Sequence, residues 1–579
     1  KRPDVMDLYA RTDMGRAVDD PKQLPALIQR GGVPMQQIVA SMLANSGQYL
    51  RRERSFEGVE YAVEGVKVNQ QSYRQFSDAI RAIFKFDLAV KEARKDIMED
   101  ILDAKGMAMS KDSGVGESAA RTTAFASIMH NIVNQMLLAI KSGQAAQRAI
   151  KAVKDGEKPV IALANTNESF ISDFADQENV SLGQALDMDF GEVLRRYLAR
   201  TLRVTIKHPD KTKEHVEIPV ERLGPGLQRM YADALAEIND GSFDGMPISP
   251  IDWIRHEVGK AGLKVAEVTG RQTMIDYSAS TPKYVARPKS EMGPAGKRGS
   301  IAAFNRGSLD VLILNRSGST GVSMHANKTF KDQRRRRMII AQAEGNIDTH
   351  LQMLGRVHRT GQVIPPAYSQ IAAEIPAEAR PTAVLMKKMA SLNANTTGAR
   401  GSVFMADSVD FMNEIGDKVV ADLLSEDAEL NDELGGALKV DNDGIPVNED
   451  AARRATGRLV LLTPEKQAEF LERVQSAYKS EVEQLDALGE NPLEAKTLDL
   501  QAKTIDTTVL KPKQGESAFL DEVRIEKVSV KAQGRAMLPS DVAAKIAEVL
   551  KVSKPTGDAP SALRELESKG RAARDAKVR

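Results

Sequence analysis

The sequence predicts an α/β fold: a parallel sheet with helices on both faces, flanked by mainly helical N- and C-terminal regions. Apolar runs of strand length open at Lys158 and cover Val265–Val268 and Val311–Leu314. Segments with helical spacing separate these runs, and Gly262 and Gly307 stand where a helical pattern gives way to a strand. Strands that alternate with helices at this pace are joined by crossovers, which makes the sheet parallel and covers both of its faces.

Before Lys158 the pattern predicts strands and then helices. Residues 55–68 alternate apolar and polar side chains on either side of Gly65, which predicts a pair of strands. Apolar side chains then recur at helical spacing over 72–104 and 119–155. The glycine- and serine-rich stretch between these two helices predicts a loop at 105–118.

After Lys158 strands and helices continue to alternate. A polar stretch at 166–250 is rich in helical patterns. Further strands are expected at 335–342 and 366–374, and a helix over 347–359 is expected between them. These elements complete the predicted sheet.

The C-terminal third reads as helices around one charged segment. Residues 422–450 hold ten acidic residues and one basic residue, Lys439, which predicts a solvated linker or insertion. A helical pattern returns over 458–490, and Ser540 is a predicted N-cap of a helix before the basic end.

The composition excludes several classes of protein. Of the 579 residues, 42% are apolar, yet no apolar stretch approaches the ~18 residues of a membrane span. The absence of cysteine excludes disulfides and zinc–thiolate sites. The start, KRPDVMDLYA, is not a signal peptide and reads as the interior of a longer chain. A cytoplasmic or nucleoid-associated protein is expected, not a secreted or membrane protein. Its net charge of +1 requires any nucleic-acid contact to come from local patches.

The helix expected over 347–359 has two unlike faces. Gln352, Arg356 and Arg359 recur at i, i+4 and i+7, about 140° away from a face that suits packing on a sheet. The apolar face consists of Ile347, Leu351 and Leu354. Two arginines and a glutamine on one rigid face suit a phosphate; a solvated basic face is the alternative.

The segment NRSGSTGVSMHA, at 315–326, follows a strand. Its glycines and hydroxyl side chains offer the donors of an anion-binding loop, and an ordinary turn at a strand end is the alternative. Other motifs fail. GPAGKRGS at 293–300 lacks the first glycine of a Walker A loop, and IPPAY at 364–368 is not the motif of an adenine methyltransferase.

Together these segments resemble the strawberry notch-like superfamily 2 helicases. QMLGRVHRTGQ is similar to helicase motif VI, SGSTGVSMHA to motif V and KPVIALANT to motif IV. Four further stretches resemble segments of the strawberry notch family: RERSFEGVEYAVEGVKV, KDQRRRRMII, KKMASLNANTTGARGS and GRLVLLTPEKQAEFLERV. The resemblance covers about residues 50–530 and is strongest at 299–415.

The resemblance implies a motor with two RecA-like lobes that bind ATP and Mg between them. This sequence holds motifs IV–VI of the second lobe but no Walker A loop and no Walker B acidic box. It therefore reads as the C-terminal half, inactive by itself, with the first lobe upstream. The implied domains are the remainder of the first lobe plus a helical linker at 1–118 and the second lobe at 119–400, with an insertion near 166–250. They are followed by a mainly helical family-specific region with an acidic linker at 401–539 and a basic tail at 540–579.

Site residues carried over by motif position are expectations of the resemblance. Arg359 is the arginine-finger candidate, Arg356 the neighbouring phosphate or structural arginine, and Gln352 a hydrogen-bonding partner of the nucleotide or the opposite lobe. Nucleotide contacts are expected from Gly321, Ser323 and Gly355, and nucleic-acid contacts from Ser319, Thr320 and Thr166. A second phosphate site is expected at Gln333, Arg334, Arg335, Arg336 and Arg337; a turn whose arginines pair with acids is the alternative. No metal ligand is expected in this chain.

The expected function is the C-terminal half of an ATP-dependent helicase or translocase on nucleic acid, with DNA as the expected substrate. The expected partners are an upstream RecA-like lobe and a fused methyltransferase or other module, without a membrane. The alternative is a non-catalytic RecA-fold module that binds nucleic acid or serves as a scaffold in a larger phage- or plasmid-type protein.

Overall fold

The computed structural model describes residues 12–16, 20–23, 26, 28, 31–48, 58–93, 120–122, 125–186, 188–207, 213–315, 322–385, 388, 411–488, 490–493, 502–513, 521–530, 564–565 and 568. The chain divides into two compact units. The first comprises Lys1–Asp7 and Pro25–Glu494, and the second comprises Leu8–Leu24 and Ala495–Arg579. No helix in the described part is both long and apolar enough to cross a membrane.

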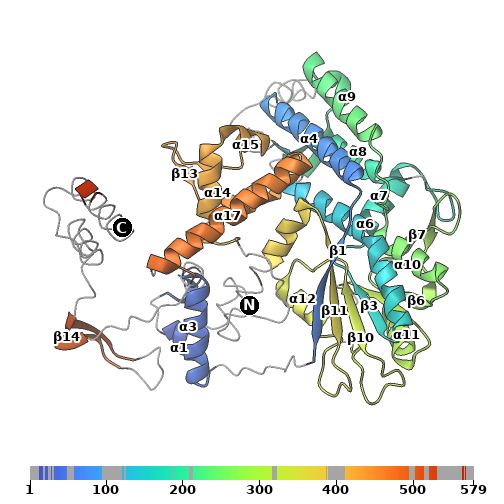
Figure 1. Cartoon of the computed structure of the whole chain (residues 1–579). Coiled ribbons are helices and arrows are strands. Elements are labelled where there is room, and N and C mark those ends of the chain that lie inside the picture. Colours follow the sequence, from blue (N-terminus) through green and yellow to red (C-terminus); the bar gives the residue numbers. More distant parts are fainter. Residues whose placement is uncertain are drawn as a thin grey trace, which may run out of the picture. The chain divides into compact units, whose positions relative to one another are not determined.

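A six-stranded parallel sheet forms the centre of the first unit, in the order β1-β11-β10-β3-β9-β6 (Figure 1). Its strands are β1 (Glu60–Val66), β3 (Lys158–Ala162), β6 (Val265–Val268), β9 (Val311–Leu314), β10 (Arg336–Ile340) and β11 (Ala367–Ala373). The strands expected at 265–268 and 311–314 are confirmed to the residue. Every residue of β3, β9 and β10 is buried, which explains why β9 is apolar throughout and why β3 and β10 are apolar after Lys158 and Arg337.

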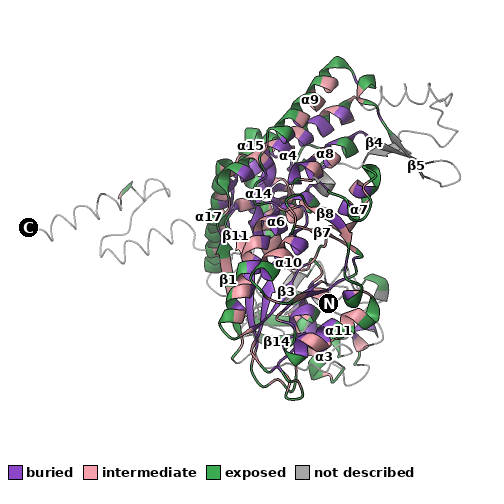
Figure 2. Cartoon of the chain, turned by 90° about the vertical axis from the view of Figure 1, so that its right-hand side faces the viewer, coloured by how far each residue is buried: buried purple, intermediate pink, exposed green. Residues whose placement is uncertain are grey.

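Helices cover both faces of this sheet, as the sequence predicts. Val160 of β3 belongs to a core with α11 (Gly293–Arg306) and α12 (Ile347–Leu354). The next residue, Ile161, belongs to a second core, with α6 (Phe125–Lys154) and α10 (Pro250–Lys260). Alternate side chains of one strand thus enter opposite cores, and Figure 2 shows the sheet buried beneath its helices. The α/β fold with a RecA-like parallel sheet is confirmed.

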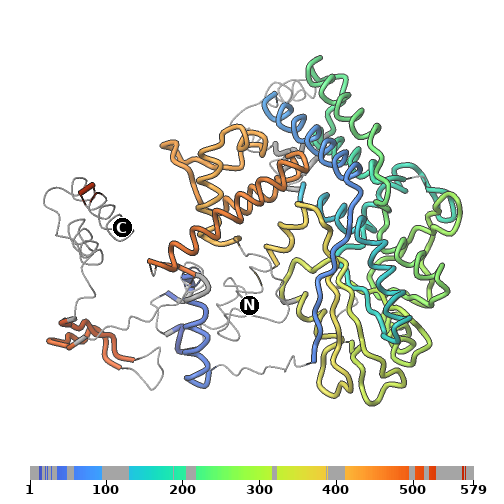
Figure 3. Tube along the Cα trace, viewed as in Figure 1, coloured from blue at the N-terminus to red at the C-terminus, as the bar shows by residue number. Residues whose placement is uncertain are grey.

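The strand pair expected at 55–68 is wrong. The structure has one strand, β1, whose partner is β11, and Figure 3 shows the two running side by side. Gly65 is no turn but lies within β1, opposite Ala372. β1 is an edge strand of the sheet. Tyr61 packs on one core and Val66 on the other, and Val63 is 46% exposed. A strand from the predicted 1–118 domain therefore belongs to the sheet of the following one.

A third, mainly helical core lies beside the sheet. It brings together α4 (Gln70–Glu92), the first half of α6, α8 (Phe190–Thr201) and α9 (Pro225–Asn239). The expected helix 72–104 corresponds to α4, and the stretch predicted as a loop at 105–118 lies outside the described residues. The insertion at 166–250 is rich in helix, as expected.

Several smaller elements were not predicted. They are α3 (Gly32–Asn45), a three-stranded sheet of β2 (Ala120–Thr122), β4 (Arg203–Lys207) and β5 (Lys213–Glu217), and the hairpin of β7 (Thr273–Asp276) and β8 (Lys283–Ala286). α7 (Glu168–Gln177) falls within the insertion. In the second unit, β14 (Ala502–Lys511) and β15 (Val523–Val530) form a further antiparallel hairpin. The helix expected after Ser540 lies outside the described residues.

The acidic segment 422–450 is not a solvated linker. It holds the end of α14 (Glu414–Glu426), α15 (Ala428–Glu433) and the small hairpin of β12 (Lys439–Val440) and β13 (Pro446–Val447). Leu424, Leu430 and Leu434 are buried in a core with α16 (Ala451–Gly457) and α17 (Pro464–Leu488). The charges lie on the outer faces, so the acidic count concealed an amphipathic pattern.

Candidate functional site

The helix at the predicted motif VI is shorter than expected. α12 ends at Leu354, whereas the sequence pattern predicts a helix to 359. The Tyr368 hydroxyl, which comes from β11, donates a hydrogen bond to the carbonyl of Leu354 at 2.8 Å. After this point the chain tightens, because the Arg356 amide bonds to Met353 three residues back. The expected apolar face is confirmed, with Ile347 and Leu354 buried on the sheet.

Arg359 lies in the turn after α12 and contacts the predicted motif V. Its Nη1 donates to the hydroxyl of Ser323 at 2.6 Å, and its Nε donates to the carbonyl of Gly355 at 3.2 Å. Its backbone amide donates to Oε1 of Gln362 at 3.2 Å. These contacts hold a half-buried guanidinium in one orientation although it is not on a helix.

Arg356 makes the second connection between the two segments. Its Nη1 donates to the carbonyl of Val322 at 3.2 Å, and its own carbonyl accepts from the amide of Met324 at 3.0 Å. Its Nε is buried without a hydrogen-bond partner, and no acidic side chain of the described residues lies within ion-pair distance. Burial and the neighbouring Arg359 lower the pKa of Arg356. Arg356 is therefore a buried cation without a matching acid among the described residues, which favours an anion beside it.

The other carried-over residues are spread out. Gln352 is exposed on α12, and Gly355 is half-buried in the following turn, so the helical face expected for Gln352, Arg356 and Arg359 does not form. Thr166 is half-buried in the loop after β3. Ser319, Thr320 and Gly321 lie outside the described residues.

The basic run after Asp332 is paired with acids and carbonyls, the alternative that the sequence left open. Arg336 is fully buried, and its guanidinium donates to the carbonyls of Met324, Asp332 and Arg334 at 2.7–2.8 Å. Arg337 is also buried and pairs with Glu157.

The less buried members of the run have acceptors of their own. Arg334 pairs with Asp332 at 2.6 Å, and Arg335 with Glu60 at 3.0 Å. The amide of Gln333 donates to the carbonyls of Lys328 and Phe330. The geometry therefore favours a structural role for the run and leaves little free charge for a phosphate.

Asp332 is the residue at the centre of this network that sequence reasoning missed. It also accepts from the buried Lys158 at 2.9 Å. Burial alone would raise the pKa of Asp332, but hydrogen bonds from Arg334 and Lys158 hold it well below its usual range. Its place two residues before four consecutive arginines was the available signal.

Comparison with known proteins matches the resemblance seen in the motifs. Residues 249–491 match the family model described as the C-terminal domain on strawberry notch homologue. The chain is 23% identical over 460 residues to strawberry notch homolog 2 of Mus musculus, covering 69% of this chain and 34% of that protein. For strawberry notch homolog 1 of Rattus norvegicus the identity is 23% over 449 residues, covering 64% and 34%.

A plant relative is also similar over a shorter stretch. Protein FORGETTER 1 of Arabidopsis thaliana is 29% identical over 204 residues, covering 33% of this chain and 15% of that protein. The chain spans about a third of the length of the animal relatives named above. It carries a strawberry notch-like, helicase-type C-terminal region.

Proposed function

We propose that this chain is the C-terminal half of an ATP-dependent superfamily 2 helicase or translocase that acts on nucleic acid, with DNA as its substrate. In this proposal an upstream RecA-like lobe binds ATP and Mg, and the turn after α12 reaches the phosphates from the opposite side. The strawberry notch-like match over 249–491 supports the assignment of this lobe.

The direct hydrogen bond between Arg359 and Ser323 carries the proposal. It joins the turn that resembles motif VI to the loop that resembles motif V, and Arg356 adds two more hydrogen bonds between the same segments. Because Ser323 and Gly355 already orient the guanidinium, Arg359 loses little side-chain entropy on engaging an anion.

The residues of the turn fit a phosphate chemically. The buried Nε of Arg356 has no acceptor, and its guanidinium has no acidic partner among the described residues, so an added anion would satisfy both. ATP supplies the phosphoryl group that is transferred. Arg359 is proposed to stabilise the charge that develops on that group, an effect worth ~10³–10⁵ in rate for arginine fingers of other NTPases. Arg356 holds the segment 322–324 and keeps Arg359 in place.

The test is ATP turnover by the complete natural polypeptide that contains this chain. Arg359→Ala is expected to lower turnover at least ~10²-fold, and Arg359→Lys to restore little, since an ammonium cannot reproduce the planar fork. Arg229→Ala is a matched control, because Arg229 is exposed on α9 and leaves a similar charge change.

Nucleic-acid binding without nucleotide should stay within about threefold of normal in Arg359→Ala, because the proposed role is catalytic. Near-normal turnover of this variant would contradict the finger assignment. It would favour the second candidate, a non-catalytic scaffold module, for which the fold alone suffices.

A further inference from the structure

One pocket of the first unit lies at the carboxyl edge of the six-stranded sheet. It has a volume of about 680 Å³ and opens beyond the carboxyl ends of β3 and β10, where Asn165 and Gln342 line it. After β3 the chain continues to β6 on one side of the sheet, whereas after β10 it continues to β11 on the other side. Neighbouring strands whose connections leave in opposite directions form a crevice in which open α/β sheets bind ligands.

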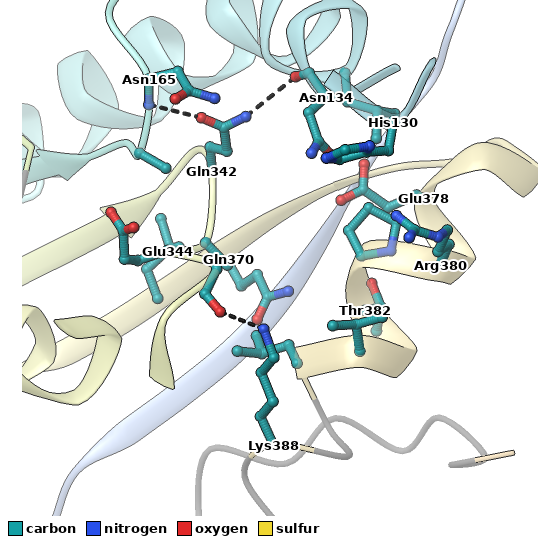
Figure 4. A pocket seen from close by; sticks show the side chains of 18 of the residues that line it. His130, Asn134, Asn165, Gln342, Glu344, Gln370, Glu378, Arg380, Thr382 and Lys388 are labelled. Atoms are coloured by element: carbon teal, nitrogen blue, oxygen red, sulfur yellow. Dashed lines mark hydrogen bonds between the residues drawn. The ribbon is translucent and has the colours of Figure 1, made fainter. Parts of the chain in front are cut away.

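Three parts of the unit wall this pocket (Figure 4). The first half of α6 supplies side chains that include His130, Asn134 and Lys141. The segment after β11 supplies Glu378 and Arg380 among others. The helical C-terminal part closes it with Met412 and Arg453. The pocket is therefore formed jointly by the edge of the sheet, α6, the segment after β11 and the helical C-terminal part.

Most charges in the pocket are already matched. Lys141 donates to both oxygens of Glu378, at 2.9 and 3.1 Å, and this pair is buried. Arg453 pairs with Asp450 at 3.0 Å. Two further charged residues, Glu344 and Lys388, also line the pocket, and Nζ of Lys388 donates to the carbonyl of Gly345.

Arg380 is different, because its charge has no counterpart. Among the described residues no acidic side chain lies within ion-pair distance of its guanidinium, and its Nε is buried without a hydrogen-bond partner. Burial and the nearby Arg453 lower the pKa of Arg380. A cation held in this way is an energetic cost that an incoming anion would remove.

The opposite wall is rich in amides. Nε2 of Gln342 donates to the backbone carbonyl of Asn134 at 3.2 Å, and its Oε1 accepts from the backbone amide of Asn165 at 3.0 Å (Figure 4). Gln370 is held by the hydroxyl of Tyr61. The side chains of Asn131 and Asn134 also line the pocket. Side-chain amides combine donors and an acceptor, as the edges of nucleobases do.

We propose that this pocket binds one nucleotide of a nucleic-acid strand, with its phosphate on Arg380, beside Arg453, and its base on the amide wall of Asn134 and Gln342. The pocket volume lies within the range of small-molecule sites, and the pairing of an unmatched cation with amides suits a nucleoside phosphate. The inference rests on the proposed function and names the place where a strand would cross this lobe.

The test is binding of a fluorescein-labelled 20-nucleotide single-stranded DNA to residues 1–579 by fluorescence anisotropy, without ATP and over a range of salt. Arg380→Gln is expected to weaken binding roughly tenfold and to lower the slope of log K against log salt by about 0.7, the value for one phosphate contact on a single strand. Asn134→Ala should weaken binding without changing the slope, because it removes a base contact and spares the carbonyl that Gln342 uses. The control Arg229→Ala should change neither quantity.

Folding is followed by thermal melting. Arg380→Gln should leave the melting temperature unchanged or raise it, since it removes a partly buried cation without a partner. Unchanged affinity and slope in Arg380→Gln would overturn the proposal. The proposal would also be overturned if Arg380→Gln lost affinity for labelled AMP but not for the labelled strand, because the pocket would then bind a free nucleotide. The test uses no ATP, so a failure of the Arg359 assignment would leave its result intact.

Discussion

Replacing Arg336 by methionine removes the side chain that ties the end of the basic run to the segment 322–324. The guanidinium is fully buried and donates from Nε to the carbonyl of Met324 at 2.8 Å and from Nη2 to the carbonyl of Asp332 at 2.7 Å. Burial lowers the pKa of Arg336 to about 10, so the side chain stays charged at neutral pH. Methionine fills a similar volume but donates nothing.

The magnitude follows from the acceptors left behind. Each buried carbonyl that loses its donor costs about 1–3 kcal/mol. The carboxylate of Asp332 keeps Lys158 and Arg334, so no buried charge is left uncompensated. Arg336→Met is therefore expected to lower the free energy of unfolding by about 3 kcal/mol.

The assay is urea unfolding of residues 1–579, followed by circular dichroism, with Arg335→Met as the matched neighbour. Arg335 pairs with Glu60, and both side chains are partly exposed, at 29% and 48%, so this variant should lose less than about 1 kcal/mol. Equal losses in the two variants would refute the reasoning, since burial would then not distinguish the two arginines. Binding of DNA should change little in Arg335→Met, because that guanidinium is already neutralised.

Three further results are expected. Residues 1–579 alone should not hydrolyse ATP even with saturating DNA; a steady-state turnover of ~1 s⁻¹ or more would overturn the half-motor proposal. Burial lowers the pKa of His350 from 6.5 to about 4, so between these pH values the unfolded chain takes up a proton that the folded protein does not. The free energy of unfolding is therefore expected to fall as the pH drops from about 6.5 to 4. His350→Met should flatten this part of the pH dependence, measured by urea unfolding. Arg271→Met should lower the free energy of unfolding by about 3–5 kcal/mol in the same assay, because it leaves the buried carboxylates of Asp252 and Glu267 without their shared partner. Adding Asp252→Asn to this variant should recover part of the loss.

The central strands could be predicted from the sequence because a strand that is buried on both faces has consecutive apolar residues. At Val311–Leu314 every position must be apolar, so the strand is visible without knowledge of its neighbours. The apolar side of α12 is visible for the same reason, since Ile347 and Leu354 recur at helical spacing. The motif-like segments around Ser323 and Arg359 were also legible, because they depend on residue type and spacing.

Other features depend on partners that lie far along the chain. β1 pairs with β11 about 300 residues later, and no local pattern in 55–68 names that partner. α12 ends at Leu354, whose carbonyl accepts from the hydroxyl of Tyr368 in β11, and Arg359 therefore lies in a turn and not on a helical face. Glu60 and Glu157, which pair with Arg335 and Arg337 of the basic run, also lie far from it along the chain.

The sequence by itself therefore determined the α/β class, the buried strands and the helicase-like motif segments of this protein. Tertiary structure decided which cations are available to an anion. It pairs Arg337 with a distant acid, whereas Arg356 and Arg380 have no acidic partner in the part of the chain that the structure describes. The physical reason is that apolar periodicity is a property of neighbouring residues, whereas the neutralisation of a buried charge depends on whichever group the fold brings within a few ångströms.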